Sequence, residues 1–145
     1  MKIKSRVDIF HNIFFYSTVL LLLCIIIFLW FDINEQTSVK IWISIVFFAV
    51  IAFMLSIRFR TYYCIDNEFL HFVTGPIKGK IKIKSIKTLE VGKTMWLGTM
   101  KPATALKGII VKYNKYDEIY ISPSDNREFT EELQKINPDI TVNFN

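Results

Sequence analysis

Four lysines alternate with other residues between positions 77 and 84. Lys78, Lys80, Lys82 and Lys84 fall on one side of this run. Side chains of a strand point to alternate faces, so the run predicts one strand with an apolar face and a basic face. Near a membrane, each lysine could add about 1 kcal/mol of attraction to anionic lipid. Lysines on the solvent face of a strand also prevent edge pairing, and the pattern leaves both interpretations open.

Groups that could catalyse a reaction or hold a metal are scattered. The two histidines (His11, His71) and the two cysteines (Cys24, Cys64) are far apart and show no metal-ligand or nucleophile–base spacing. The chain has no glycine-rich phosphate loop. A net charge of +5 over 145 residues is too mild for a nucleic-acid-binding tail. We therefore expect a non-enzymatic protein with no catalytic residue, metal, cofactor or nucleic-acid partner.

A long connection without clear periodicity spans residues 92–106. It contains Met95, Trp96 and Met100, which could anchor a protein partner on an apolar surface. The alternative is that they are core or membrane-contacting residues, because single apolar side chains on a surface need no special role.

Two apolar runs occupy residues 13–31 and 41–57, and neither contains a charged residue. The first would be about 28 Å long as a helix, close to the thickness of a bilayer core. Two spans cannot close a barrel, so both are predicted to be helices. A cleaved signal peptide fits poorly because no small-residue cleavage pattern follows. Soluble core helices and interfacial helices fit poorly because both runs are long, uncharged and without a polar face.

Basic residues flank the two runs asymmetrically. Lys2, Lys4 and Arg6 precede the first run, Arg58 and Arg60 follow the second, and the intervening loop has only Lys40. The positive-inside rule then places both termini in the cytoplasm. The predicted parts are a tail (1–12), a span (13–31), an outer loop (32–40), a second span (41–57) and a cytoplasmic domain (58–145). Because the spans lack ionisable groups, they are expected to anchor rather than transport.

The C-terminal part predicts short antiparallel strands followed by one helix. Strand-like segments are residues 61–65, 69–74, 77–83, 86–91, 108–113 and 118–122. Asp125 and Glu128 form a capping-box pattern at the start of the helix. Phe129, Leu133 and Ile136 share one helix face, and Asn137-Pro138 ends the helix. The expected fold class is α+β, with five to seven antiparallel strands in a roll or barrel closed by the helix.

Four motifs in order resemble the bacterial pleckstrin-homology (PH) domain, specifically the YyaB-like family with membrane helices before the domain. The motifs are Tyr62-x-x-Ile65 with Leu70-x-Phe72 and Gly75; Ile81-x-Ile83-x-x-Ile86; Pro102-Ala103-x-Ala105-Leu106 with 109–113; and Ile121-Ser122-Pro123-x-Asp125 with Phe129, Leu133, Asn137-Pro138 and Ile140. The resemblance implies a PH-like fold in the bacterial plasma membrane. It implies no enzymatic activity.

The expected function is a membrane-anchored PH-like binding module that engages a protein partner or the anionic membrane surface. Phosphoinositide binding is not favoured, because the first hairpin turn of the domain carries Asp66 and Glu68 where positive charge would be needed. The alternative is bacteriocin immunity or membrane-stress resistance, since some small membrane proteins with similar domains behave this way.

Overall fold

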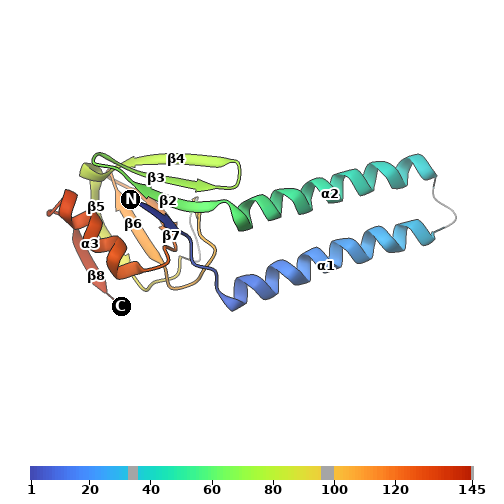
Figure 1. Cartoon of the computed structure of the whole chain (residues 1–145), viewed down its shortest axis with the longest axis horizontal. Helices are drawn as coiled ribbons and strands as arrows, with labels where there is room; N and C mark the ends of the chain where they lie inside the picture. The colour runs from blue at the N-terminus through green and yellow to red at the C-terminus, as the bar shows by residue number, and fades with distance from the viewer. Residues whose placement is uncertain (33–35, 96–99, 145) are drawn as a thin grey trace.

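The computed structural model describes residues 1–32, 36–95 and 100–144. Two antiparallel helices form a hairpin at one end of an elongated molecule, and a β domain lies at the other end (Figure 1). The helices are α1 (Ile9–Phe31) and α2 (Thr37–Phe59). At 23 residues each, they are about 35 Å long and start before the apolar runs themselves. Both are long and apolar enough to cross a membrane.

The described residues of the domain form two four-stranded sheets. The first has the order β1 (Lys2–Lys4), β2 (Thr61–Ile65), β3 (Phe69–Thr74), β4 (Ile77–Lys82), all antiparallel. The second has the order β7 (Asp117–Ile121), β6 (Ile109–Tyr113), β5 (Ile86–Val91), β8 (Thr141–Phe144). Only β8 is parallel to its neighbour, β5. A short 3-10 turn, η1 (Ile83–Ser85), leads from β4 into β5.

The core of the domain lies between the sheets and α3 (Asn126–Ile136). Phe129 and Leu133 of α3 are fully buried, which confirms the predicted apolar face of this helix. The inner faces of the sheets supply the rest of the core, including Tyr63, Leu70, Ile81, Leu89, Val111 and Ile119. In β2 buried residues alternate with half-buried ones, as the two-residue period of a strand with one inner face predicts.

Helix α3 begins and ends where the sequence predicts. The Asp125 carboxylate accepts hydrogen bonds from the backbone N–H groups of Arg127 (2.8 Å) and Glu128 (3.1 Å), as an N-cap does. At the other end, the Asn137 side chain donates to the Ile83 carbonyl at 3.0 Å. This bond ties the end of α3 to the turn between the two sheets.

Strand β1 was not predicted, because residues 1–12 were expected to form a tail. Instead, Lys2, Ile3 and Lys4 pair with β2, and the N-terminal amine donates to the Ile65 carbonyl at 2.7 Å. Ile3 is buried in the core. The first residues of the chain are therefore part of the domain.

A buried hydroxyl cluster fastens the segment after β1 to the rest of the domain. The Ser5 hydroxyl lies 2.9 Å from the hydroxyls of both Thr104 and Ser122. The Tyr63 hydroxyl donates to the Pro102 carbonyl at 2.5 Å and accepts from the Ser122 N–H at 3.0 Å. These bonds join four chain segments that are far apart in the sequence.

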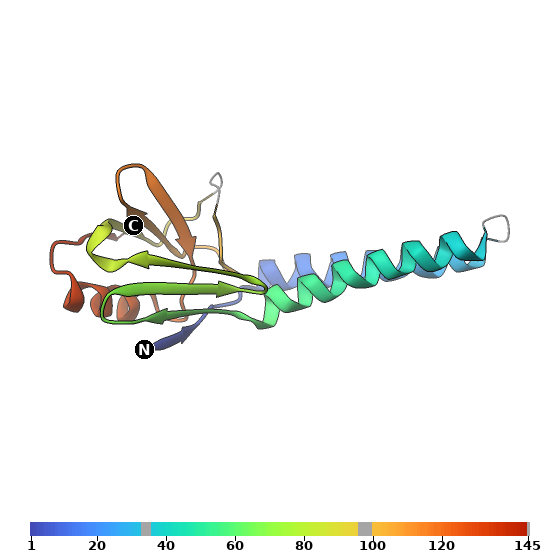
Figure 2. The same cartoon turned by 90° about the horizontal axis from the view of Figure 1, so that it is seen from above.

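The strands of the first sheet lie roughly along the same axis as the two helices (Figure 2). β2 follows α2 directly, and β3 returns toward the helices. β4 therefore starts next to the helix ends and runs away from them. This direction decides how far each side chain of the first sheet lies from the helices.

Candidate functional site

The predicted lysine run lies on β4 and η1, at one edge of the first sheet. Lys78, Lys80, Lys82 and Lys84 are all exposed, and Ile81 and Ile83 are buried. Two details differ from the prediction. Ile77 is 43% exposed because it begins an edge strand, and Ile83 belongs to η1 rather than to the strand. The ammonium group of Lys80 lies 4.9 Å from the centre of the Phe69 ring, so this lysine also packs on its neighbouring strand.

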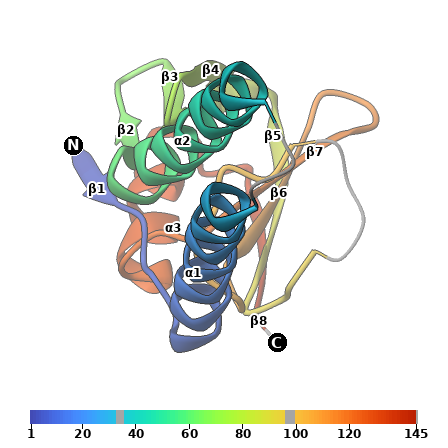
Figure 3. The ribbon, with the colours of Figure 1, turned by 90° about the vertical axis from the view of Figure 1, so that its right-hand side faces the viewer.

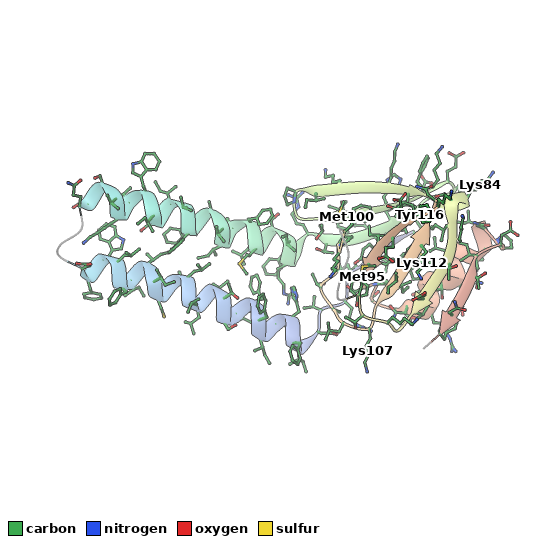
Figure 4. The ribbon with its side chains drawn as sticks, turned by 180° about the vertical axis from the view of Figure 1, so that it is seen from behind. Lys84, Met95, Met100, Lys107, Lys112 and Tyr116 are labelled. Carbon is green, nitrogen blue, oxygen red and sulfur yellow. The ribbon has the colours of Figure 1, made fainter. Side chains whose placement is uncertain are left out.

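The four lysines lie at different distances from the helix ends. Ile77 pairs with Thr74, which pairs with Thr61 just after α2, so Lys78 lies nearest the helices. Lys84 lies at the far end of the domain (Figure 4). Lys78 and Lys82 are about 13 Å apart at the rise of a strand. The run therefore extends along the length of the first sheet, from the helix ends to the far end of the domain.

A second basic cluster does lie at the helix ends. Lys2 and Lys4 of β1, Arg58 at the end of α2 and Arg60 after it line one pocket of about 380 Å³. Its other lining residues are uncharged: Ser5, Val7, Phe59, Thr61 and Tyr62. We call this the basic pocket. Sequence reasoning missed it, although the Lys2-Ile3-Lys4 alternation was a signal for a short strand with a basic face.

Two contacts organise the side chains of the basic pocket. The Arg58 guanidinium donates to the Asn12 side-chain oxygen of α1 at 2.8 Å, which holds it between the two helices. The Lys2 ammonium lies 4.1 Å from the centre of the Tyr62 ring. Within the described residues, none of the four cations forms an ion pair with a carboxylate. Their charge is therefore not neutralised inside the described part of the protein.

An apolar pocket of about 330 Å³ lies on the other side of α1. Figure 3 looks along the helices, with β1 on one side of α1 and the connection after β5 on the other. Phe10, His11 and Phe14 of α1 form one wall, and the described part of the connection forms much of the other, with Met95, Ala103 and Leu106. The size suits a small apolar ligand or side chain.

The predicted partner-binding residues have different environments. Met95 is only 7% exposed and packs against Ile110 and Tyr120, so it is a wall of the apolar pocket rather than a protruding anchor. Met100 is 38% exposed. Trp96 lies outside the described residues. The structure thus brings Met95 to a pocket and does not place Met100 among its lining residues.

Tyr120 gives the apolar pocket a rigid floor. Its hydroxyl donates to the Ala105 carbonyl at 2.8 Å and accepts from the Gly108 N–H at 2.9 Å. Burial raises the pKa of Tyr120, because the charged phenolate is disfavoured away from water. A Cβ atom at Gly108 would lie 2.1 Å from the Ile121 carbonyl oxygen, so only glycine fits this close approach.

The family model of the bacterial PH domain matches residues 61–137, which is more than half of the chain, and the chain belongs to this family. The match begins with β2 and ends after α3, so α1, α2, β1 and β8 lie outside it. Neither the curated proteins nor the solved structures contain a match to the chain. PH domains are generally non-catalytic binding modules, and the fold agrees with this class.

Proposed function

We propose that this protein is a membrane-anchored, non-enzymatic binding module of the bacterial plasma membrane. In this proposal α1 and α2 cross the bilayer, and the PH-like domain lies in the cytoplasm. The domain engages the anionic surface of the membrane or a protein partner next to it. The observation that carries the proposal is the outward exposure of the apolar side chains of both helices.

In the most apolar 18-residue stretch of each helix, only 11% of α1 and 17% of α2 is buried inside the protein. The core helices of a soluble protein would be mostly buried, because water around such side chains costs free energy in proportion to their area. A hydrocarbon environment removes this cost, and the length of both helices matches its thickness.

The pairing of β1 with β2 supports a topology with both ends on one side. β1 precedes α1 and β2 follows α2, so the two strands can meet only if the helices return to the same side. The basic pocket lies at that end of the hairpin. At the opposite end Lys40 is buried and donates to the Asp32 carbonyl. Unpaired cations at the domain end favour the cytoplasmic side.

A protein partner remains the alternative to the anionic surface, and the apolar pocket is the feature that favours it. The proposal also places the chain in the YyaB-like family, in which membrane helices precede the PH domain. An immunity role is tested separately: deleting the gene should change the sensitivity of the host to a membrane-active peptide if that role is correct.

Reporter fusions to the full chain test the topology. We expect a reporter after residue 145 to read cytoplasmic and one inserted in the loop between α1 and α2 to read extracytoplasmic. Fractionation should recover the chain with the membranes, and the chain should resist extraction by carbonate. A soluble chain would contradict the anchor, and the reverse reporter pattern would contradict the orientation. The full chain is needed because a fragment starting at Arg58 would lack β1.

A further inference from the structure

We propose that the basic pocket is a binding site for the phosphate group of an anionic phospholipid headgroup. The inference rests on the proposed function, since it places the pocket at the inner surface of the membrane. Its ligand is a phosphodiester such as that of phosphatidylglycerol. Lys4 and Arg60 are the principal contacts, and Lys2 and Arg58 complete the positive field.

The first argument is convergence. Arg58 lies in the last turn of α2 and Arg60 directly follows the helix. The positive-inside rule and the helix dipole favour cations at this position. Lys2 and Lys4 come from the other end of the sequence and reach the same pocket through the β1–β2 pairing, in which Lys4 lies opposite Tyr62. The positive-inside rule favours basic residues before α1, but it does not require Lys2 and Lys4 to share one pocket with Arg58 and Arg60.

The second argument is charge. The pocket lining comprises four cations and no carboxylate among the described residues. Cations brought together in one pocket repel one another unless an anion lies between them. An arginine presents a planar fork that matches phosphate oxygens, and a lysine adds a point charge. A phosphate group carries the charge and the acceptors that this arrangement lacks.

The third argument is position. In the proposed topology the end of α2 lies at the level of the inner headgroups, and Phe59 is exposed there beside the pocket. Aromatic rings favour this interfacial level. The Arg58–Asn12 hydrogen bond keeps one cation fixed at the base of the two helices. In the register of the first sheet, Lys4 and Lys2 lie level with Lys78 and Lys80 of β4. What distinguishes Lys2 and Lys4 is that β1 is the opposite edge strand, where they share a pocket with Arg58 and Arg60.

The test uses the full chain in detergent, with native mass spectrometry to count retained lipids. We expect the wild type to retain phosphatidylglycerol in preference to phosphatidylcholine. The double variant Lys4→Gln/Arg60→Gln should weaken this retention about 30-fold, roughly fivefold for each cation removed. The matched control Lys80→Gln/Lys82→Gln removes the same charge from β4 and should stay within about twofold of the wild type.

Equal losses in the pocket variant and in the β4 control would overturn the proposal in favour of general charge attraction, and so would an unchanged pocket variant. Charge-preserving Lys4→Arg/Arg60→Lys should retain the lipid, which separates loss of binding from misfolding. Inorganic phosphate distinguishes the sources: a lipid site keeps its phosphatidylglycerol in millimolar phosphate, whereas displacement would assign the pocket to soluble phosphate. A cytoplasmic reporter with no lipid preference would reject this site alone, and an extracytoplasmic reporter would reject the proposed function itself.

Discussion

The helical hairpin and the β domain use the same kinds of apolar residue in opposite ways. Phe28 of α1 is 73% exposed, whereas Phe129 of α3 is fully buried. On the described part of the hairpin, the buried apolar side chains are Phe15, Ile26 and Ile51, while the domain buries its apolar residues between two sheets and a helix. The domain therefore has a core of its own, and the hairpin does not.

The difference shows that the two regions are built for different solvents. The domain gains stability by removing apolar area from water, as any globular unit does. The hairpin leaves its apolar area outside, which is stable only where the surroundings are themselves apolar. Substitutions that remove apolar area, or that add charge, should consequently have opposite rankings in the two regions.

The largest contrast should come from removing one phenylalanine in each region. Phe129→Ala leaves a cavity in the domain core and should lower its free energy of unfolding by about 3–5 kcal/mol. Phe28→Ala should leave domain stability unchanged, because its ring faces outward. Hydrogen exchange of the β6 amides in the full chain would measure both. Similar protection in the two variants would remove the contrast between the regions.

Adding a charge should have the opposite effect, with a larger cost in the helical hairpin than on the surface of the domain. Leu20→Arg places a cation near the middle of α1, where membrane insertion should cost about 2.5–3.5 kcal/mol. Tyr116→Arg, at the exposed turn between β6 and β7, should cost almost nothing (Figure 4). The inserted fraction in a membrane-integration assay measures the effect. Normal insertion of the Leu20→Arg chain would argue against a lipid-facing α1.

Removing one hydroxyl should weaken the attachment of the segment after β1 to the rest of the domain. Tyr63→Phe leaves the buried Ser122 N–H without its partner and should cost about 1–3 kcal/mol. Burial also raises the pKa of Tyr63, so its neutral form contributes stability below the ordinary value of 10.0 that is lost as pH rises through the higher folded value. The variant should lose less stability above pH 10 than the wild type. Tyr116→Phe is the control, and equal unfolding curves for the two variants would contradict the role of the cluster.

A smaller effect is expected at the N-cap of α3. Asp125→Ala removes the acceptor of two backbone N–H groups and should cost about 1 kcal/mol. Asp125→Asn should restore most of it, since an amide oxygen also caps. Urea unfolding of the domain would show this order, and an alanine variant as stable as the wild type would mean that the cap is dispensable.

The smallest effect should come from a surface ion pair of the second sheet. Glu90 lies 2.6 Å from the Lys112 ammonium and 3.1 Å from that of Lys93, and these contacts lower its pKa. The ionised carboxylate contributes stability above its ordinary value of 4.5, which is lost as pH falls through the lower folded value. Glu90→Gln should cost under about 1 kcal/mol at pH 7 and nothing at pH 2. Glu131→Gln, on the exposed face of α3, is the control; a difference that persists at pH 2 would contradict the ion-pair explanation.

Local patterns in the sequence were sufficient for much of the fold. The strand-forming residues at 61–65 and 69–74, with a turn sequence between them, predicted β2 and β3 with their observed bounds. The cap at Asp125 and the break at Asn137-Pro138 predicted α3. Such signals are short-range, because strand alternation, helix periodicity and capping depend on residues within about four positions of one another.

Contacts across the whole chain had to come from the tertiary structure. The pairing of Lys2–Lys4 with β2 joins residues about sixty positions apart, and the Ser5–Ser122 contact spans 117. These contacts turned an expected tail into a strand, brought Lys4 beside Arg60 and buried Met95 in a pocket wall. The sequence by itself determined which segments are helix or strand and which are apolar enough for lipid. Only folding decided which distant side chains share a surface, because that depends on how the sheets pack.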